Sequence, residues 1–168
     1  MDLDNSLMKA LEELLADSRI YISPRFKLAG PLNALTDRSM GKILIIDDSK
    51  PIRRLLEYIL TRENFEVIST QDGFEAIFWL SEGNRPDLII SDIEMPNFNG
   101  EEVISNLNNS GIFSDLPVII LTGLESESIK ANCLSRGVFG YLTKPFDPAT
   151  LIRMVNEAIM TSKSKIKI

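Results

Sequence analysis

Several apolar runs in this chain end in a polar side chain that a buried strand does not need. The run KILII leads directly into Asp47 and Asp48, and the run DLIIS leads into Asp92. Carboxylates at the ends of buried strands lose hydration and repel one another, so they destabilise a fold unless something offsets their charge. Two later runs end in a hydroxyl, Thr122, and in a cation, Lys144. The repeated pattern predicts that these five side chains form one site.

The chemistry of these side chains suits phosphoryl transfer on a metal ion. The chain has no histidine, and a set of carboxylate oxygens without nitrogen or sulfur ligands favours Mg²⁺ (or Mn²⁺). A carboxylate can attack phosphorus and form an acyl phosphate, while a metal ion, an ammonium group and a hydroxyl offset charge on the transferred group. We expect Asp92 to be the nucleophile because its run brings it to the site alone. Thr122 would then supply the hydroxyl and Lys144 the cation.

Each of these residues also has an ordinary structural interpretation. Asp48, just ahead of Pro51, could cap a helix, and for the pair Asp47 and Asp48 taken alone capping and metal binding are equal alternatives. Thr122 could simply end a strand and Lys144 could simply be solvated. The joint occurrence of such residues at four strand ends favours the functional interpretation.

The elements that must position this site follow a βα repeat. From residue 42 onward, short β-branched runs alternate with longer segments of helical periodicity, such as PIRRLLEYILTR, which places its apolar residues on one stripe. Near-continuous apolar strands indicate a parallel sheet that helices cover on both faces. The pattern predicts an α/β, doubly wound (βα)5 domain in which ligands bind beyond the carboxyl ends of the strands. The predicted strands KILII, FEVIST, DLIIS, PVIIL and VFGYL begin near residues 42, 65, 87, 117 and 138.

Three segments are expected along the chain. Residues 1–40 read as an amphipathic helix with a leucine stripe, followed by a connecting arm that Pro and Gly residues interrupt. Residues 41–162 form the α/β domain, and residues 163–168 form a Lys-rich tail. Because an isolated helix of this length is marginal in water, the leucine stripe must pack against something. Its own domain is one alternative; a homodimer contact or a partner protein is the other.

Composition narrows the function classes further. A net charge of -6 argues against nucleic-acid binding, which usually needs a basic face. A single cysteine, Cys133, rules out an internal disulfide framework and suits a reducing cytoplasm. The sequence contains no apolar run of membrane-spanning length, so we expect no membrane segment.

The stretches ILIIDDSKPIRRLL, DGFEAI, PDLIISDIEMPNFNG, PVIILTG and GYLTKPF occur in this order. Through them, the segment from Lys42 to about Thr161 resembles the response-regulator receiver domain of two-component signalling. The resemblance implies a flavodoxin-like fold with strand order 2-1-3-4-5 and an N-terminal helical extension outside it. It implies the following site: phosphoacceptor Asp92; metal ligands Asp47, Asp48, Asp92 and the backbone carbonyl of Glu94; switch residues Thr122 and Tyr141; phosphate-binding Lys144; and a cis Lys144-Pro145 bond.

The resemblance also implies the activity and its partners. The domain would accept a phosphoryl group from the phosphohistidine of a histidine kinase or histidine phosphotransfer protein and lose it by slow hydrolysis, without acting as a turnover enzyme. No output domain is evident after residue 161, so we expect output through contact with a downstream protein target or passage of the phosphoryl group to another histidine protein. A phosphohydrolase is the alternative, since DIE resembles the Asp-x-Asp pair of haloacid-dehalogenase-like enzymes, although that family places its nucleophile after the first strand. A phosphorylation-independent scaffold is a third alternative, which the filled acidic and lysine positions do not support.

Overall fold

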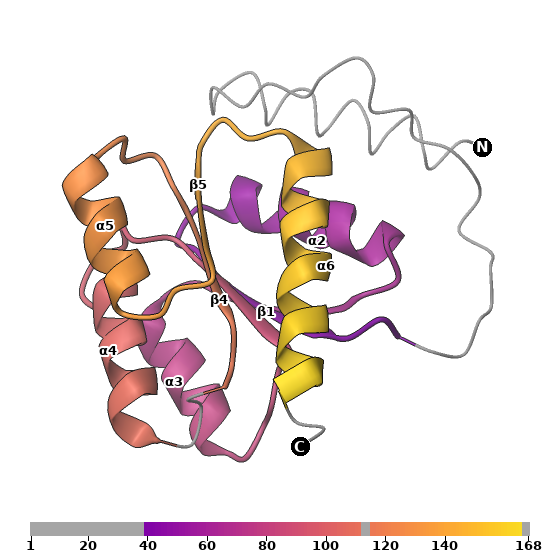
Figure 1. Cartoon of the computed structure of the whole chain (residues 1–168), viewed down its shortest axis with the longest axis horizontal. Coiled ribbons are helices and arrows are strands. Elements are labelled where there is room, and N and C mark those ends of the chain that lie inside the picture. Colours follow the sequence, from indigo (N-terminus) through magenta and orange to yellow (C-terminus); the bar gives the residue numbers. More distant parts are fainter. Residues whose placement is uncertain (1–38, 112–114, 166–168) are drawn as a thin grey trace.

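The computed structural model of the protein describes residues 39–111 and 115–165. Strands and helices alternate along the described chain, as the sequence pattern predicts (Figure 1). The elements are β1 (Lys42–Ile46), α2 (Lys50–Arg62), β2 (Glu66–Thr70), α3 (Gly73–Ser81), β3 (Leu88–Ser91), α4 (Gly100–Ser110), β4 (Val118–Thr122), α5 (Glu127–Ser135), β5 (Gly140–Thr143) and α6 (Pro148–Lys165).

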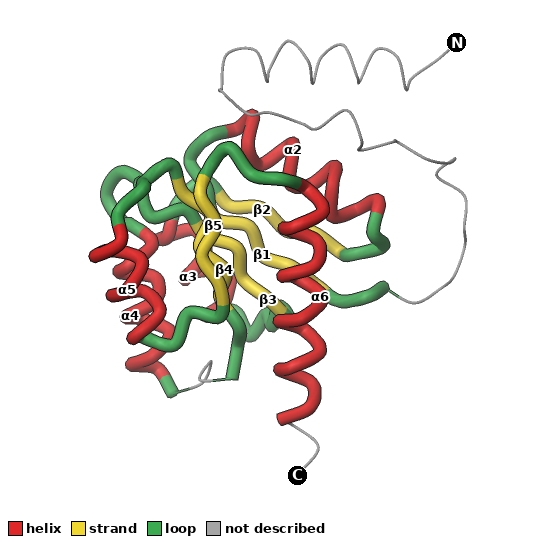
Figure 2. Tube along the Cα trace, turned by 45° about the horizontal axis from the view of Figure 1, so that its top comes forward, coloured by secondary structure: helices red, strands yellow, loops and turns green. Residues whose placement is uncertain are grey.

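The five strands form one parallel sheet with the order β2-β1-β3-β4-β5, which confirms the predicted fold class and strand order. The sheet lies in the middle of the domain, with helices on both sides (Figure 2). Helices α2 and α6 cover one face, and α3, α4 and α5 cover the other. Because every connection between parallel strands crosses over through a helix, all carboxyl ends of the strands meet at one edge of the sheet.

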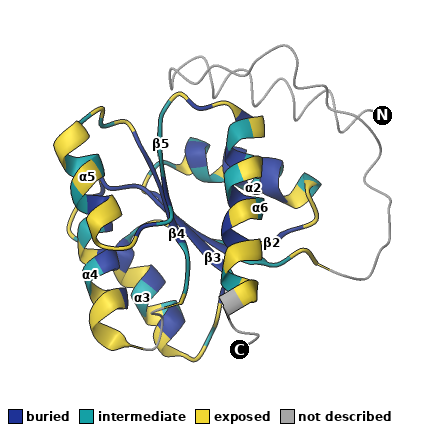
Figure 3. Ribbon diagram, in the orientation of Figure 1, coloured by how far each residue is buried: buried dark blue, intermediate teal, exposed yellow. Residues whose placement is uncertain are grey.

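The central strands are buried on both faces (Figure 3). Alternate side chains of a strand point to opposite faces. In β1, Ile43 and Ile45 join the core beneath α2 and α6, while Leu44 and Ile46 join the core beneath α3, α4 and α5. The predicted apolar stripe of α2 is buried as expected: Ile52, Leu55, Leu56, Ile59 and Leu60. These two packed layers hold the strand ends, and so the polar residues that follow them, in fixed positions.

Two expectations concern the ends of the chain. The predicted N-terminal helix and nearly all of its connecting arm lie outside the described residues. At the other end, α6 continues to Lys165, beyond the expected domain boundary at residue 162. No glycine or proline follows Pro148 to stop the helix, so the start of the Lys-rich tail belongs to α6.

Candidate functional site

The register of the sheet brings the acidic residues together. Ile46 of β1 pairs with Ser91 of β3, so the residues that follow them, Asp47 and Asp92, leave the sheet side by side. The amide of Asp92 donates to the carbonyl of Ile46 at 2.9 Å, which fixes this alignment. Both aspartates are buried, with exposed fractions of 2% for Asp47 and 6% for Asp92. Asp48 is exposed and completes the acidic group at the mouth of the site.

Lys144 follows the edge strand β5, and its side chain extends along the carboxyl edge of the sheet to this acidic group. Its Nζ lies 2.8 Å from Oδ2 of Asp47 and 2.6 Å from Oδ2 of Asp92. The remaining carboxylate oxygens accept backbone amides, Asp47 Oδ1 from Ser49 at 2.8 Å and Asp92 Oδ1 from Glu94 at 3.0 Å. The two buried carboxylates are therefore held in orientation as well as in position, and one oxygen of each points toward a shared cation.

Burial and charge oppose each other in this group. Burial raises the pKa of the Asp47 carboxyl, and the neighbouring charge of Asp92 adds to the rise, whereas Lys144 partly offsets it. For Lys144, burial alone would lower the pKa, but the carboxylates of Asp47 and Asp92 together raise it above its ordinary value. The site therefore holds Lys144 as a charged ammonium directly beside Asp92.

Three carboxylates and one ammonium leave this site with excess negative charge. One oxygen from each of Asp47, Asp48 and Asp92 lies within 4.8 Å of the other two. Such a set of hard oxygen ligands fits a small divalent cation, which would balance the charge that Lys144 leaves uncompensated. The donor set thus agrees with the acidic metal site expected of a receiver domain.

Thr122 and Tyr141 meet at one backbone position beside the site. Thr122 is fully buried, and its Oγ1 accepts the amide of Leu124 at 3.3 Å. The Tyr141 hydroxyl donates to the backbone carbonyl of Leu124 at 2.9 Å. Burial raises the pKa of the Tyr141 phenol, and nearby acidic groups add to the rise, so this hydroxyl remains a donor. The Lys144-Pro145 peptide bond is cis.

Two further residues shape the site, and sequence reasoning did not assign them there. Arg53 of α2 donates from its guanidinium to the carbonyl of Asp47 at 2.6 Å. Gly100 begins α4 directly against the backbone of Asp92, where a Cβ would overlap the Asp92 carbonyl oxygen. The sequence suggests only that Gly100 ends a turn, because nothing local shows which backbone approaches it.

Comparison with known proteins identifies the family. The model of the response regulator receiver domain matches residues 43–156, which is most of the described chain. The chain belongs to this family. Receiver domains are phosphoacceptor signalling domains of two-component systems rather than turnover enzymes, and they act with a cognate histidine kinase. The acidic group of Asp47, Asp48 and Asp92 is typical of the family's phosphoacceptor pocket.

Individual receiver proteins show the same similarity. The alkaline phosphatase synthesis transcriptional regulatory protein PhoP of Bacillus subtilis (strain 168) is 35% identical over 122 residues, which cover 73% of this chain and 50% of that protein. The receiver domain of the Francisella response regulator 1452 superposes with a TM-score of 0.67 at 33% identity, covering 73% of this chain and 98% of that one. The chemotaxis protein CheY4 of Vibrio cholerae gives 0.66 at 33% identity, covering 71% and 98%.

The chain spans about half the length of the curated relatives it matches. Within residues 39–111 and 115–165, no helix combines the length and the apolar character that crossing a bilayer requires.

Proposed function

We propose that this protein accepts a phosphoryl group on Asp92 from the phosphohistidine of a histidine kinase or histidine phosphotransfer protein. The observation that carries the proposal is the position of Lys144, whose ammonium contacts both Asp92 and Asp47 at hydrogen-bonding distance. A structural ion pair would need only one carboxylate, and burying a second one beside it is costly. A site that binds a negatively charged phosphoryl group needs a cation beside the attacking carboxylate, and this requirement explains why Lys144 lies between Asp47 and Asp92.

The proposed transfer uses a simple displacement. A carboxylate oxygen of Asp92 attacks phosphorus, the bond from phosphorus to the imidazole nitrogen breaks, and its electron pair stays on that nitrogen. Lys144, already charged, binds an oxygen of the transferred group. The carboxylates of Asp47, Asp48 and Asp92 and the carbonyl of Glu94 would hold Mg²⁺ (or Mn²⁺). When bound, that ion would neutralise further charge on the phosphoryl oxygens.

The stoichiometry of phosphorylation tests this function against a phosphohydrolase. With acetyl phosphate and Mg²⁺, we expect one acid-stable, base-labile phosphoryl group per chain, measured by intact mass. EDTA should abolish the labelling, because the acidic residues would then meet the incoming charge without the cation. Steady turnover of a generic phosphomonoester such as p-nitrophenyl phosphate would contradict the proposal and favour the hydrolase.

We further propose that phosphorylation switches a protein-binding surface through Thr122 and Tyr141. Both side chains bond the backbone of Leu124. The Thr122 hydroxyl accepts there and can donate its own proton to a phosphoryl oxygen, a partner that exists only in the phosphorylated state. A ligand changes a conformational equilibrium only through such a differential interaction.

The switch predicts a specific loss in the Thr122→Val variant. Phosphorylation of the wild-type protein should change the amide chemical shifts of residues 125–160, whereas Thr122→Val should still be phosphorylated but show much smaller changes. Thr161→Val is the matched control, because its exposed hydroxyl only donates to the carbonyl of Glu157. Unchanged shifts in the phosphorylated wild-type protein would refute the switch.

The remaining parts of the proposal concern the rest of the chain. We place the receiver domain at residues 41–162, with the N-terminal helix and arm of residues 1–40 outside it. The Lys-rich end at 163–168 begins within α6, which extends to Lys165. We expect the output to be contact with a downstream protein in the cytoplasm. The acidic composition, with a net charge of -6, supports a protein partner over nucleic acid. The leucine stripe of the N-terminal helix would serve a homodimer or partner contact.

A further inference from the structure

Helix α3 presents two phenylalanines to solvent. Phe74 and Phe78 have exposed fractions of 59% and 65%, and they lie one helical turn apart. The ring of Phe98, from the loop that follows β3, packs beside Phe74 with 4.8 Å between ring centroids. We call Phe74, Phe78 and Phe98 the aromatic face. Single exposed apolar residues are ordinary, but three adjacent aromatic rings mark a surface that other apolar groups cover.

The packing of α3 against the sheet does not account for this face. Within α3, Ala76 and Leu80 are buried, and the partly buried Ile77 and Trp79 pack against the same core, whereas Phe74 and Phe78 do not belong to it. Phe98 is held in place because Gly73 has no side chain, and a Cβ at Gly73 would overlap the Phe98 ring. The pairing of Phe98 with Phe74 therefore depends on the close approach of the loop before α4 to the start of α3.

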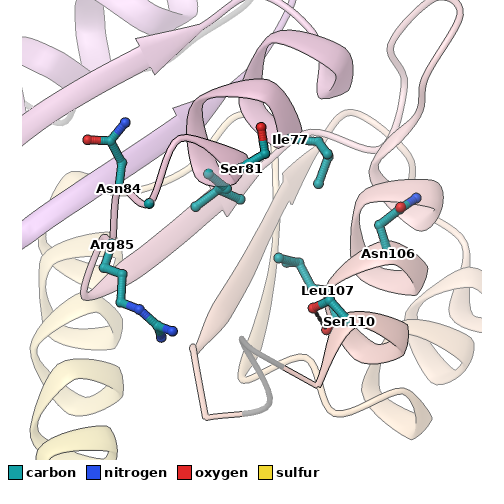
Figure 4. Close-up of a pocket in the computed structure, with 9 residues that line it drawn as sticks. Ile77, Ser81, Asn84, Arg85, Asn106, Leu107 and Ser110 are labelled. Atoms are coloured by element: carbon teal, nitrogen blue, oxygen red, sulfur yellow. Dashed lines mark hydrogen bonds between the residues drawn. The ribbon is translucent and has the colours of Figure 1, made fainter.

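A cavity continues the apolar surface toward the other end of α3. It has a volume of about 290 Å³ and lies between the C-terminal parts of α3 and α4. Its lining includes the apolar Leu80. Ile77 and Leu107, together with the polar Ser81 and Asn106, also line it (Figure 4). The aromatic face and this cavity together offer apolar contacts along the whole length of α3.

The surroundings of the aromatic face are acidic. Asp72 caps the N-terminus of α3 and Glu75 lies in its first turn, and Glu101 and Glu102 lie in the first turn of α4. Between residues 63 and 129 the sequence contains a single basic residue, Arg85, which lines the cavity at the opposite end of α3. Arg136, which reaches α4 through a bond to Ser105, lies on the side of α4 that faces α5. The aromatic face therefore fits a segment that is apolar and basic.

The chain itself contains such a segment. Residues 18–36 include three cations, Arg19, Arg25 and Lys27, and no acidic residue, although the whole chain has a net charge of -6. Within this stretch, RIYISPRFKL (residues 19–28) combines those cations with isoleucine, tyrosine, phenylalanine and leucine side chains. Its charge and apolar content complement the aromatic face and its acidic surroundings.

We propose that residues 19–28 bind the aromatic face of the same chain. The described chain starts at Ser39, and the ten residues from 29 to 38 can extend roughly 33 Å, about the diameter of a small domain. A tether of this length raises the effective concentration of the segment to the millimolar range, which favours it over a second copy in dilute solution. This contact does not depend on phosphorylation of Asp92, so its failure leaves the proposed function untouched.

A spin label on the segment tests the contact in the full-length protein. The Ser23→Cys variant, in a Cys133→Ala background that removes the natural cysteine, carries a nitroxide and is observed by amide NMR. The proposal predicts loss of the amide signals of Phe74, Phe78 and Phe98 with the label oxidised, and their recovery when the label is reduced. Signal loss confined to α2 or α6, or spread evenly over the domain, would overturn it.

Charge reversal provides the matched control. Arg25→Glu with Lys27→Glu, in the labelled background, should abolish the signal loss at the aromatic face, whereas Lys165→Glu with Lys167→Glu makes the same charge change at the other end of the chain and should preserve it. Equal behaviour of the two variants would overturn the charge argument. Mixing labelled protein with unlabelled ¹⁵N protein separates the occupants: signal loss in the unlabelled copy would show binding between copies and overturn the intramolecular assignment.

Discussion

Replacing Asp92 with asparagine is expected to reduce phosphorylation of the protein to background. The Asp92 carboxylate lies against the Lys144 ammonium at 2.6 Å and belongs to the acidic group that would hold the metal ion, so both charges would lie beside a phosphoryl group that arrives there. An amide is a far weaker nucleophile and cannot form a stable acyl phosphate. The fold should survive, because the asparagine oxygen can still accept the amide of Glu94, which now bonds Asp92 Oδ1 at 3.0 Å.

The measurement is incorporation of one phosphoryl group from acetyl phosphate in the presence of Mg²⁺, followed by intact mass. Asp115→Asn is the matched control, since Asp115 is exposed and lies outside the site, and it should be phosphorylated as the wild type is. Circular dichroism checks that both variants remain folded. If Asp92→Asn took up label as fast as the wild type, another residue would have to be the phosphoacceptor.

Replacing Lys144 with methionine is expected to slow phosphorylation by roughly 10²–10³-fold, the usual cost of removing one preorganised group that stabilises developing charge. Methionine keeps most of the length and apolar stem of lysine but removes the ammonium that contacts Asp47 and Asp92. Since these carboxylates raise the pKa of Lys144, the wild-type side chain stays charged throughout the neutral range. The defect of the variant should therefore be nearly constant between pH 6 and pH 8.

The rate of phosphorylation by acetyl phosphate at saturating Mg²⁺ provides the measurement. Lys163→Met is the matched control. Lys163 is exposed on α6, so this variant removes a lysine charge in the same way but away from the site. Its rate should equal that of the wild type. A Lys144→Met protein that is phosphorylated at the wild-type rate would show that Lys144 only balances the resting charge of the site.

The sequence by itself determined the fold and which residues belong to the site, because both follow from patterns within short stretches of chain. Alternating strands and helices require crossovers, and crossovers put every strand end at one edge, so Asp47, Asp92, Thr122 and Lys144 could be assigned together from their places in the repeat. The two-face burial of β1 and the apolar stripe of α2 follow from side-chain periodicity alone. These features depend on short stretches of chain and on general rules of topology.

Only the tertiary structure decided which groups touch. Lys144 and Asp47 are 97 residues apart, and their contact depends on the twist of the sheet and on the loop after β5. The shared bonding of Thr122 and Tyr141 to Leu124, the approach of Gly100 to Asp92 and the pairing of Phe98 with Phe74 were likewise invisible in the sequence. The physical reason is range: periodicity reports on neighbours along one element, whereas these contacts depend on the packing of several elements that are distant in the chain.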